Sequence, residues 1–183
     1  MHKIPRPERE RRIEELLAYV GLQACADEQI QRYSGGMVRR ILIARAMLHR
    51  PPILFMDEPT IGLDPQTRRK IWDLIQLMNR EGVTVLLTTH YIEEAESLCH
   101  RVGIVDYGRL VALGTPAELK ASLGVACAEF LGSHGTSRHF FPTRAEAKEY
   151  AQGRDEDITV QRTNLEDVFV ELTGREAREL SSG

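Results

Sequence analysis

The sequence has only three cysteines among 183 residues and carries no excess of positive charge. Cys25, Cys99 and Cys127 lie far apart and form no CxxC pair, which favours reduced thiols over a disulfide framework or a zinc site. The formal net charge is −3, and no basic stripe with interleaved aromatic residues is present. This balance argues against a nucleic-acid partner held by bulk charge.

Long apolar runs are also missing. The longest runs, such as Val83 to Leu87 with its interruption at Thr84, are far shorter than the roughly 20 residues that span a bilayer. Met1 to Arg6 lack the apolar segment of a secretory signal, so we expect a chain that does not cross a membrane and stays in the cytoplasm. There is no internal repeat, and the length suits one substantial core or one core with an appendage.

What is present is an apolar run that ends in two acids. Ile53 to Met56 lie between prolines and predict a strand buried on both faces, as in parallel sheets. Asp57 and Glu58 follow it, and the carboxyl ends of strands line the ligand crevice of open α/β sheets. Asp57 would hold Mg²⁺ through oxygen, and Glu58 would polarise a water aimed at a phosphate. Because such strand ends are also common without a ligand, the flanking sequence decides between the two interpretations.

Ser34-Gly35-Gly36 begins a predicted helix that runs to about His49. Free backbone amides, the positive end of the helix dipole and two residues without Cβ atoms would let a phosphate approach closely. The structural alternative is a capped turn that binds nothing. Arg39 and Arg40 are expected on the solvated face of this helix.

The segment from Asp64 to His90 predicts a strand-helix-strand crossover and therefore a parallel sheet. Asp64 is an N-cap followed by proline, and a second buried strand runs from Val83 to Thr88. The helix between them has a predicted buried face made of Ile71, Leu74, Ile75 and Met78. A lone histidine is usually a buried or capping residue, but His90 lies directly beyond the strand that neighbours the two acids.

The rest of the chain carries fewer chemical signals. A helix from Tyr91 to His100 is expected to place Glu93, Glu94 and Glu96 on a solvated face. A hairpin over 102–113 and a helix with a capping box over 115–118 follow. From Gly124 onward the composition becomes loose and polar, which indicates the start of an appendage.

The last periodic segment predicts a helix that ends at Gly174. Its apolar face consists of Leu165, Val168, Phe169 and Leu172. A possible strand over 158–160 precedes it.

Four of these pieces, in this order, resemble the ATPase subunits of ATP-binding cassette transporters. Ser34-Gly35-Gly36 resembles the signature motif, Ile53 to Glu58 the Walker B strand with its catalytic glutamate, Gly62-Leu63-Asp64 the D-loop, and His90 the switch histidine. The resemblance runs from about residue 4 to about residue 123. Asn164 to Phe169, with the Leu-Thr-Gly that follows, is similar to the closing helix of drug-export subunits of the daunorubicin-resistance type.

This resemblance implies an α/β fold, a partial P-loop NTPase-type sheet flanked by helices, with a small α+β appendage at the C-terminal end. It implies ATP and Mg²⁺ as ligands. Asp57 would position the metal, Glu58 would act as base on the attacking water, and His90 would sense the γ-phosphate. The function implied is ATP hydrolysis that powers export of a drug-like or lipophilic substrate.

Other residues are implied to act across a dimer of ATPase subunits. Ser34, Gly35 and Gly36 would bind a phosphate held by the partner subunit, and Asp64 would lie at the dimer interface. The family usually has glutamine where this chain has Met37, which removes a polar contact. The implied partners are a second ATPase subunit and a separate transmembrane permease, which would place the chain in the cytoplasm against the inner face of the cell membrane.

The family's phosphate-binding loop, GxxxxGK[ST], does not occur in this sequence. No lysine follows a glycine; the four are Lys3, Lys70, Lys120 and Lys148. The chain therefore resembles the C-terminal portion of a catalytic subunit. On that basis residues 1–50 would belong to the helical subdomain with the signature helix, 51–123 to the C-terminal half of the ATPase core, and 124–183 to the appendage. We also expect that apolar surface near Ile53 to Met56 is uncovered.

Two other interpretations remain open. The chain would be a non-catalytic docking module that completes one ATP site of an intact partner subunit, using only its signature helix and Asp64. It would otherwise be a head lobe of a chromosome-maintenance or recombination ATPase. The sustained heptads of the coiled coils that accompany such lobes are not found, which disfavours the last interpretation.

Overall fold

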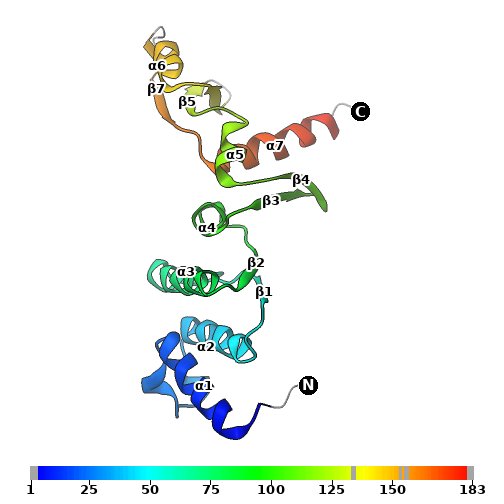
Figure 1. Cartoon of the computed structure of the whole chain (residues 1–183). Helices are drawn as coiled ribbons and strands as arrows, with labels where there is room; N and C mark the ends of the chain where they lie inside the picture. Colours follow the sequence, from blue (N-terminus) through cyan, green and yellow to red (C-terminus); the bar gives the residue numbers. More distant parts are fainter. Residues whose placement is uncertain (1–3, 133–134, 153, 155–156, 181–183) are drawn as a thin grey trace. The chain divides into compact units, whose positions relative to one another are not determined.

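The computed structural model of the chain describes residues 4–132, 135–152, 154 and 157–180 (Figure 1). The chain divides into two compact units, Met1–His90 and Tyr91–Gly183, here called the N-terminal unit and the C-terminal unit. The predicted three-part division at residues 50 and 123 stays a prediction.

The N-terminal unit is a helical segment followed by a strand-helix-strand crossover. In order, its elements are α1 (Arg6–Tyr19), η1 (Gln23–Cys25), η2 (Ile30–Arg32), α2 (Gly35–Met47), β1 (Ile53–Asp57), α3 (Pro65–Arg80) and β2 (Thr84–Thr88). Strands β1 and β2 pair in parallel, from Ile53 opposite Thr84 to Asp57 opposite Thr88. The parallel pair and its crossover helix, both predicted from the sequence, are confirmed.

Helix α3 supplies much of the apolar core of this unit. Its hydrophobic residues recur at the helical period on one face, and Ile71, Leu74, Ile75 and Met78 are all buried as predicted. Helices α2 and α3 contact each other, and α3 also contacts β2. The helix ends at Arg80, before Gly82, which has a φ of 91°.

One face of the strand pair is covered, and β1 is covered better than β2. The residues of β2 are only exposed or half-buried, so the prediction of a second buried strand is wrong. Along β1, Leu54 and Met56 are buried, whereas Ile53 and Phe55 are exposed, Phe55 to 72%. Leu86 lies opposite Phe55 in the register and is also exposed. The prediction that this strand is buried on both faces is therefore wrong, because a continuous apolar run does not reveal how many faces are covered. The expected uncovered apolar surface near this strand is present.

In its described residues, the C-terminal unit combines a hairpin with a three-stranded sheet and four helices (Figure 1). In order, its elements are α4 (Ile92–Leu98), β3 (Val102–Asp106), β4 (Arg109–Gly114), α5 (Pro116–Ala121), β5 (Ala126–Gly132), β6 (Gly135–Phe141), α6 (Arg144–Gln152), β7 (Ile158–Arg162) and α7 (Leu165–Leu180). Strands β3 and β4 form the predicted hairpin, and the antiparallel sheet has the order β6-β5-β7. The segment after Gly124, which its polar composition predicted to be the start of an appendage, contains the paired strands β5 and β6.

The hairpin and the helices around it share an apolar core. Val102, Ile104, Leu119, Leu165 and Val168 are buried together, and residues of α4 pack against them. Helix α7 runs past Gly174 to Leu180, so the predicted end of that helix is wrong.

The three acids of α4 are not all solvated, as had been predicted. Glu94 is fully buried, and Glu96 accepts hydrogen bonds from Lys120 Nζ and from the backbone N–H of Leu165. Only Glu93 is exposed. Glu96 therefore joins α4 to α5 and to the start of α7 within this unit.

The chain has an α/β fold: a parallel strand pair flanked by helices, with an α+β arrangement toward the C-terminal end. Among the described residues, no helix combines the length and the apolar character that crossing a membrane requires.

Candidate functional site

Polar groups meet at the carboxyl ends of β1 and β2. Asp57 and Thr88 are direct partners in the register, and the Thr88 hydroxyl donates a hydrogen bond to the Asp57 carboxylate. The backbone N–H of Glu58 donates to the Thr88 carbonyl over 3.1 Å. Glu58 has a φ of 47°, a left-handed conformation that non-glycine residues rarely adopt. The chain therefore turns sharply at Glu58 while its amide remains bonded to the neighbouring strand.

The side chain of Glu58 faces His90. The distance from His90 Nδ1 to Glu58 Oε2 is 2.9 Å, which becomes an ion pair when the imidazole is protonated. The His90 side chain is 54% exposed and that of Glu58 30%. The predicted glutamate and histidine are thus neighbours, on a surface that a ligand can reach.

Arg39 is a member of this group that the sequence reasoning missed. Its Nη2 donates to the backbone carbonyl of Glu58 over 2.9 Å, so α2 is tied to the end of β1. Arg40 Nη1 donates to the Val20 carbonyl over 2.8 Å, at the end of α1. Both arginines are half-buried, and the prediction that they form a solvated face is wrong. Their long side chains reach carbonyls far away in the sequence, which helical spacing alone could not indicate.

The start of α2 matches the predicted Ser-Gly-Gly helix terminus. Ser34 is the N-cap, and its hydroxyl accepts a hydrogen bond from the backbone N–H of Met37 over 3.3 Å. The two glycines have different surroundings. A Cβ on Gly35 would meet nothing within 4 Å, whereas a Cβ on Gly36 would lie 2.3 Å from the Thr67 methyl group. Packing against α3 accounts for Gly36, and Gly35 leaves open space at the helix terminus.

Asp64 has a local structural role. It is the N-cap of α3, and its Oδ1 accepts a hydrogen bond from the backbone N–H of Thr67 over 3.0 Å. Hydrogen bonds from the side chain and then the backbone of Thr67 lower the pKa of the Asp64 carboxyl. Asp64 is exposed, and Thr67 also contacts the Gly36 position. The starts of α2 and α3 therefore lie side by side, with an anion on one and free amides on the other.

The residues at the strand ends fit a hard cation that completes its coordination with oxygens from a ligand and water. Among the described residues no group of three or more histidine, cysteine or acidic side chains could hold a metal. Mg²⁺ is commonly bound through one or two carboxylates together with phosphate oxygens and water. Asp57 is exposed and accepts one hydrogen bond, so its carboxylate suits that type of site.

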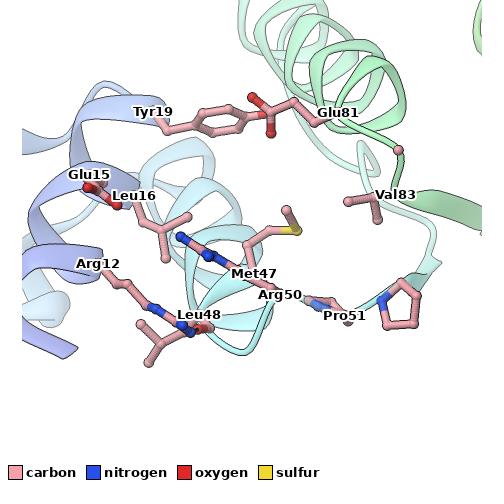
Figure 2. Close-up of a pocket in the computed structure, with 12 residues that line it drawn as sticks. Arg12, Glu15, Leu16, Tyr19, Met47, Leu48, Arg50, Pro51, Glu81 and Val83 are labelled. Carbon is pink, nitrogen blue, oxygen red and sulfur yellow. Dashed lines mark hydrogen bonds between the residues drawn. The ribbon is translucent and has the colours of Figure 1, made fainter. Parts of the chain in front are cut away.

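A cavity lies near the amino ends of strands β1 and β2, at the opposite end of the strand pair from Asp57 and Thr88 (Figure 2). It has a volume of about 590 Å³, and its lining includes Pro52, just before β1, and Val83, just before β2. In Figure 2 the ring of Tyr19 extends toward the carboxylate of Glu81. Burial, together with the charge of Glu81, raises the pKa of Tyr19 to about 12. This cavity contains none of the predicted site residues, so it is separate from the group around Glu58.

Known proteins with similar sequences include several that are named as ATP-binding proteins. A family model described as ABC transporter matches residues 2–61. A daunorubicin/doxorubicin resistance ATP-binding protein of Streptomyces peucetius is 47% identical over 113 residues, which cover 62% of this chain and 34% of that protein. Nod factor export ATP-binding protein I of Cupriavidus metallidurans is 38% identical over an alignment of 190 positions, with 92% of this chain and 62% of that protein covered.

A solved structure has the same fold over part of its length. The structure of cbiO1 from Clostridium perfringens, described as part of the ABC transporter complex cbiONQ, matches with a TM-score of 0.59 and 30% identity. The match covers 64% of this chain and 47% of that one. The chain spans less than two thirds of the length of the relatives that it matches.

Proposed function

The chain belongs to the ABC transporter family, and we propose that it acts as the C-terminal portion of an ATP-hydrolysing subunit of an exporter. Two of its relatives are named for daunorubicin/doxorubicin resistance and for Nod factor export. The proposed cargo is accordingly a drug-like or lipophilic compound, which would pass through a separate membrane subunit. This chain would take part in ATP binding and hydrolysis, and the membrane subunit would form the path of the cargo.

The observation that carries the proposal is the contact between Glu58 and His90 at the ends of a parallel strand pair. In the proposed roles Glu58 takes a proton from the attacking water, and His90 holds Glu58 in place until a γ-phosphate competes for it. Arg39 positions Glu58 through its carbonyl, because that bond fixes the backbone at a left-handed residue. Arg39 is a positioning residue, not a catalytic one.

Asp57 is the proposed ligand of Mg²⁺. The metal would neutralise charge on the phosphates of bound ATP. The Thr88 hydroxyl orients the Asp57 carboxylate from the neighbouring strand. Both groups come from strand ends that the register places opposite each other.

Ser34, Gly35, Gly36 and Asp64 have proposed roles in a partner's ATP site. The amides at the start of α2 would face a phosphate held by a second ATPase subunit, and Gly35 leaves room for it. Asp64 would lie at the interface of the two subunits. The proposed location is the inner face of the cell membrane, where the chain would contact its permease from the cytoplasm.

The open helix terminus at Ser34 and Gly35 supports an alternative function. The chain would then be a docking module that completes one ATP site of an intact partner with its signature helix. The two functions assign importance to different residues. Glu58 and His90 matter for a catalytic portion, whereas Ser34 and Gly35 matter for a docking module.

Titration calorimetry with ATP and Mg²⁺ tests the docking function. The purified chain is titrated alone and together with a complete cassette subunit whose own signature serine is replaced. We expect no binding by the chain alone, because it lacks the phosphate-binding loop. Heat beyond that of the partner alone, lost in Ser34→Ala or Gly35→Val, would support action in trans. Micromolar binding by the chain alone would contradict both functions as stated.

A chimera tests the catalytic function. A segment that carries a GxxxxGK[ST] loop, taken from a complete cassette subunit, is fused ahead of residue 1, and ATP turnover is measured. We expect Glu58→Gln to lower turnover by about 10²-fold or more, the usual contribution of a general base. Glu93→Gln changes an exposed acid of α4 and is the matched control. Turnover that is equal in the parent and in Glu58→Gln would rule out the catalytic role of Glu58.

A further inference from the structure

The C-terminal unit has a basic cavity that none of the proposed ATPase roles uses. Its volume is about 390 Å³, and its polar lining consists of Lys120, Arg144, Arg162 and Thr163. These residues come from α5, from the first position of α6 and from the end of β7. We call it the β7 cavity.

The sheet topology explains why these residues meet. Strand β5 begins where β6 and β7 both end, so Ala126 pairs with Phe141 on one side and with Arg162 on the other. The residue before it, Val125, donates its N–H to the Phe141 carbonyl over 2.9 Å and accepts from the Thr163 N–H over 3.3 Å. Helix α6 starts three residues after Phe141, which brings Arg144 to the same end of the sheet. The arrangement therefore rests on backbone pairing.

The cavity carries an excess of positive charge. With the residues that the structure describes, neither Arg144 nor Arg162 forms an ion pair, and both are exposed. The nearby acids have other partners: Glu96 pairs with Lys120, and Glu146 bonds to Thr143 at the start of α6. Two arginine forks from different elements therefore remain available to one anion. Their planar geometry matches phosphate oxygens.

Thr163 gives an independent indication of a ligand. The residue is only 7% exposed, and its hydroxyl is buried without a hydrogen-bond partner among the described residues. Buried hydroxyl groups in proteins nearly always have a partner, because leaving one unpaired is unfavourable. A phosphate oxygen in the cavity would accept this hydrogen bond.

We propose that the β7 cavity binds the phosphate group of an organic phosphomonoester, held by Arg144, Arg162 and the Thr163 hydroxyl. The cavity is larger than a phosphate ion, and its other walls are the apolar Ala117, Ala121 and Val125. The ligand therefore carries an organic part next to its phosphate. A soluble metabolite and the headgroup of a lipid share this chemistry. Binding would give the C-terminal unit a ligand of its own, distinct from ATP at the strand ends of the N-terminal unit.

Calorimetric titration of the full chain with glycerol 3-phosphate at constant ionic strength tests the site. We expect saturable one-site binding that weakens about tenfold or more in Arg162→Gln and in Thr163→Val. Arg109→Gln removes an exposed arginine of β4 and should bind as the parent does. Heat that does not saturate, or that is equal in Thr163→Val and the parent, would overturn the proposal.

The melting temperature provides a second readout. Thr163→Val keeps the shape of the side chain and removes the unpaired hydroxyl. Without ligand it should melt at or above the temperature of the parent, and glycerol 3-phosphate should no longer raise that temperature. A variant that melts well below the parent in the absence of ligand would show that the hydroxyl has a structural partner, and the proposal would fail.

Vesicles distinguish the two sources of phosphate. Cosedimentation of the chain with phosphatidic acid vesicles, but not with phosphatidylcholine vesicles, would identify a lipid headgroup if Arg162→Gln and Thr163→Val abolish it. Binding of glycerol 3-phosphate without cosedimentation would identify a soluble ligand. Failure to bind either probe would overturn the proposal.

Discussion

The two units of the chain differ in how their sheets are supported. In the N-terminal unit one face of the strand pair is bare, with Phe55 and Leu86 both exposed. In the C-terminal unit the start of the central strand, Ala126 to Ala128, is buried to 1% exposure or less. The N-terminal unit has well-placed polar groups at its strand ends, whereas the C-terminal unit has the more complete core. We infer that the C-terminal unit is the more independent folding unit. The N-terminal unit needs another protein surface to cover the exposed face of its strand pair.

The largest expected effect is in the core of the C-terminal unit. Leu165 is 2% exposed and packs with Val102 and Ile104. Leu165→Ala should lower the free energy of unfolding of this unit by about 3 kcal/mol, through lost burial and the cavity left behind. Leu131→Ala, at a position 81% exposed, should change it by less than about 0.5 kcal/mol.

The single tryptophan lets the two units be followed separately. Trp72 lies on α3, so its fluorescence reports on the N-terminal unit, whereas far-ultraviolet circular dichroism reports on both. In urea, Leu165→Ala should shift part of the dichroism transition and leave the Trp72 transition in place. A shift of both transitions by the same amount would show one cooperative structure and would break the comparison.

The second prediction concerns the contact between α2 and α3. A Cβ at Gly36 would lie 2.3 Å from the Thr67 methyl, so Gly36→Ala should destabilise the N-terminal unit by about 1–3 kcal/mol. Gly35→Ala, in open space on the same helix turn, should not. Thr67→Ser removes the obstructing methyl and should restore much of the loss in the double variant. The urea unfolding transition, followed by Trp72 fluorescence, is measured for the parent, Gly36→Ala, Gly35→Ala and the double variant. An equal loss of stability in Gly35→Ala would contradict the steric explanation.

The third prediction uses pH to separate the units. Burial, with a contribution from the charge of Asp167, raises the pKa of the Cys127 thiol to about 11 from an ordinary 9.0. The unfolded chain therefore loses this proton first, and the stability of the C-terminal unit should fall as pH rises from 9 toward 11. Cys127→Ala should reduce that slope, and the part that remains is attributed to Cys99, because burial raises the pKa of that thiol too.

The N-terminal unit serves as the control for this pH dependence of stability, over the lower part of the interval from pH 9 to 11. The pKa of Tyr19 is raised to about 12 from 10.0, so its own alkaline loss begins near pH 10. Between pH 9 and 10 the C-terminal unit should weaken more than the N-terminal unit in urea titrations. Equal weakening of the Trp72 transition in that interval would contradict the assignment of the effect to Cys127.

Much of the candidate site could be predicted because it rests on local rules. Ser34 and Asp64 are N-caps as expected from their side chains and the residues that follow. The parallel pairing followed from two apolar runs joined by an amphipathic helix, and it brings Glu58 and His90 together. Each of these features depends on spacing over fewer than about ten residues or on one crossover.

The rest depends on contacts between segments that are distant in the sequence. Nothing near Arg39 indicates that its side chain reaches the Glu58 carbonyl, nor that Glu94 is buried. Gly174 predicted a helix end, but a single glycine costs a helix only about 1 kcal/mol, and α7 continues through it. The glycine, serine and threonine residues of β6 resemble a loop in composition, but the whole strand pairs with β5.

The smallest change in stability is expected at the exposed face of the β1-β2 strand pair. A substitution there is informative because it tests directly whether this face is uncovered. Phe55→Thr keeps a strand-forming residue at a position 72% exposed, so the free energy of unfolding should change by less than about 0.5 kcal/mol. Because Phe55 lies opposite Leu86, the substitution divides one apolar patch, and self-association in sedimentation velocity should decrease. Leu131→Thr, an isolated exposed position of β5, should leave self-association unchanged. A loss of 2 kcal/mol or more in Phe55→Thr, a magnitude typical of a buried residue, would mean that this face is covered within the chain, and the contrast between the two units would then disappear.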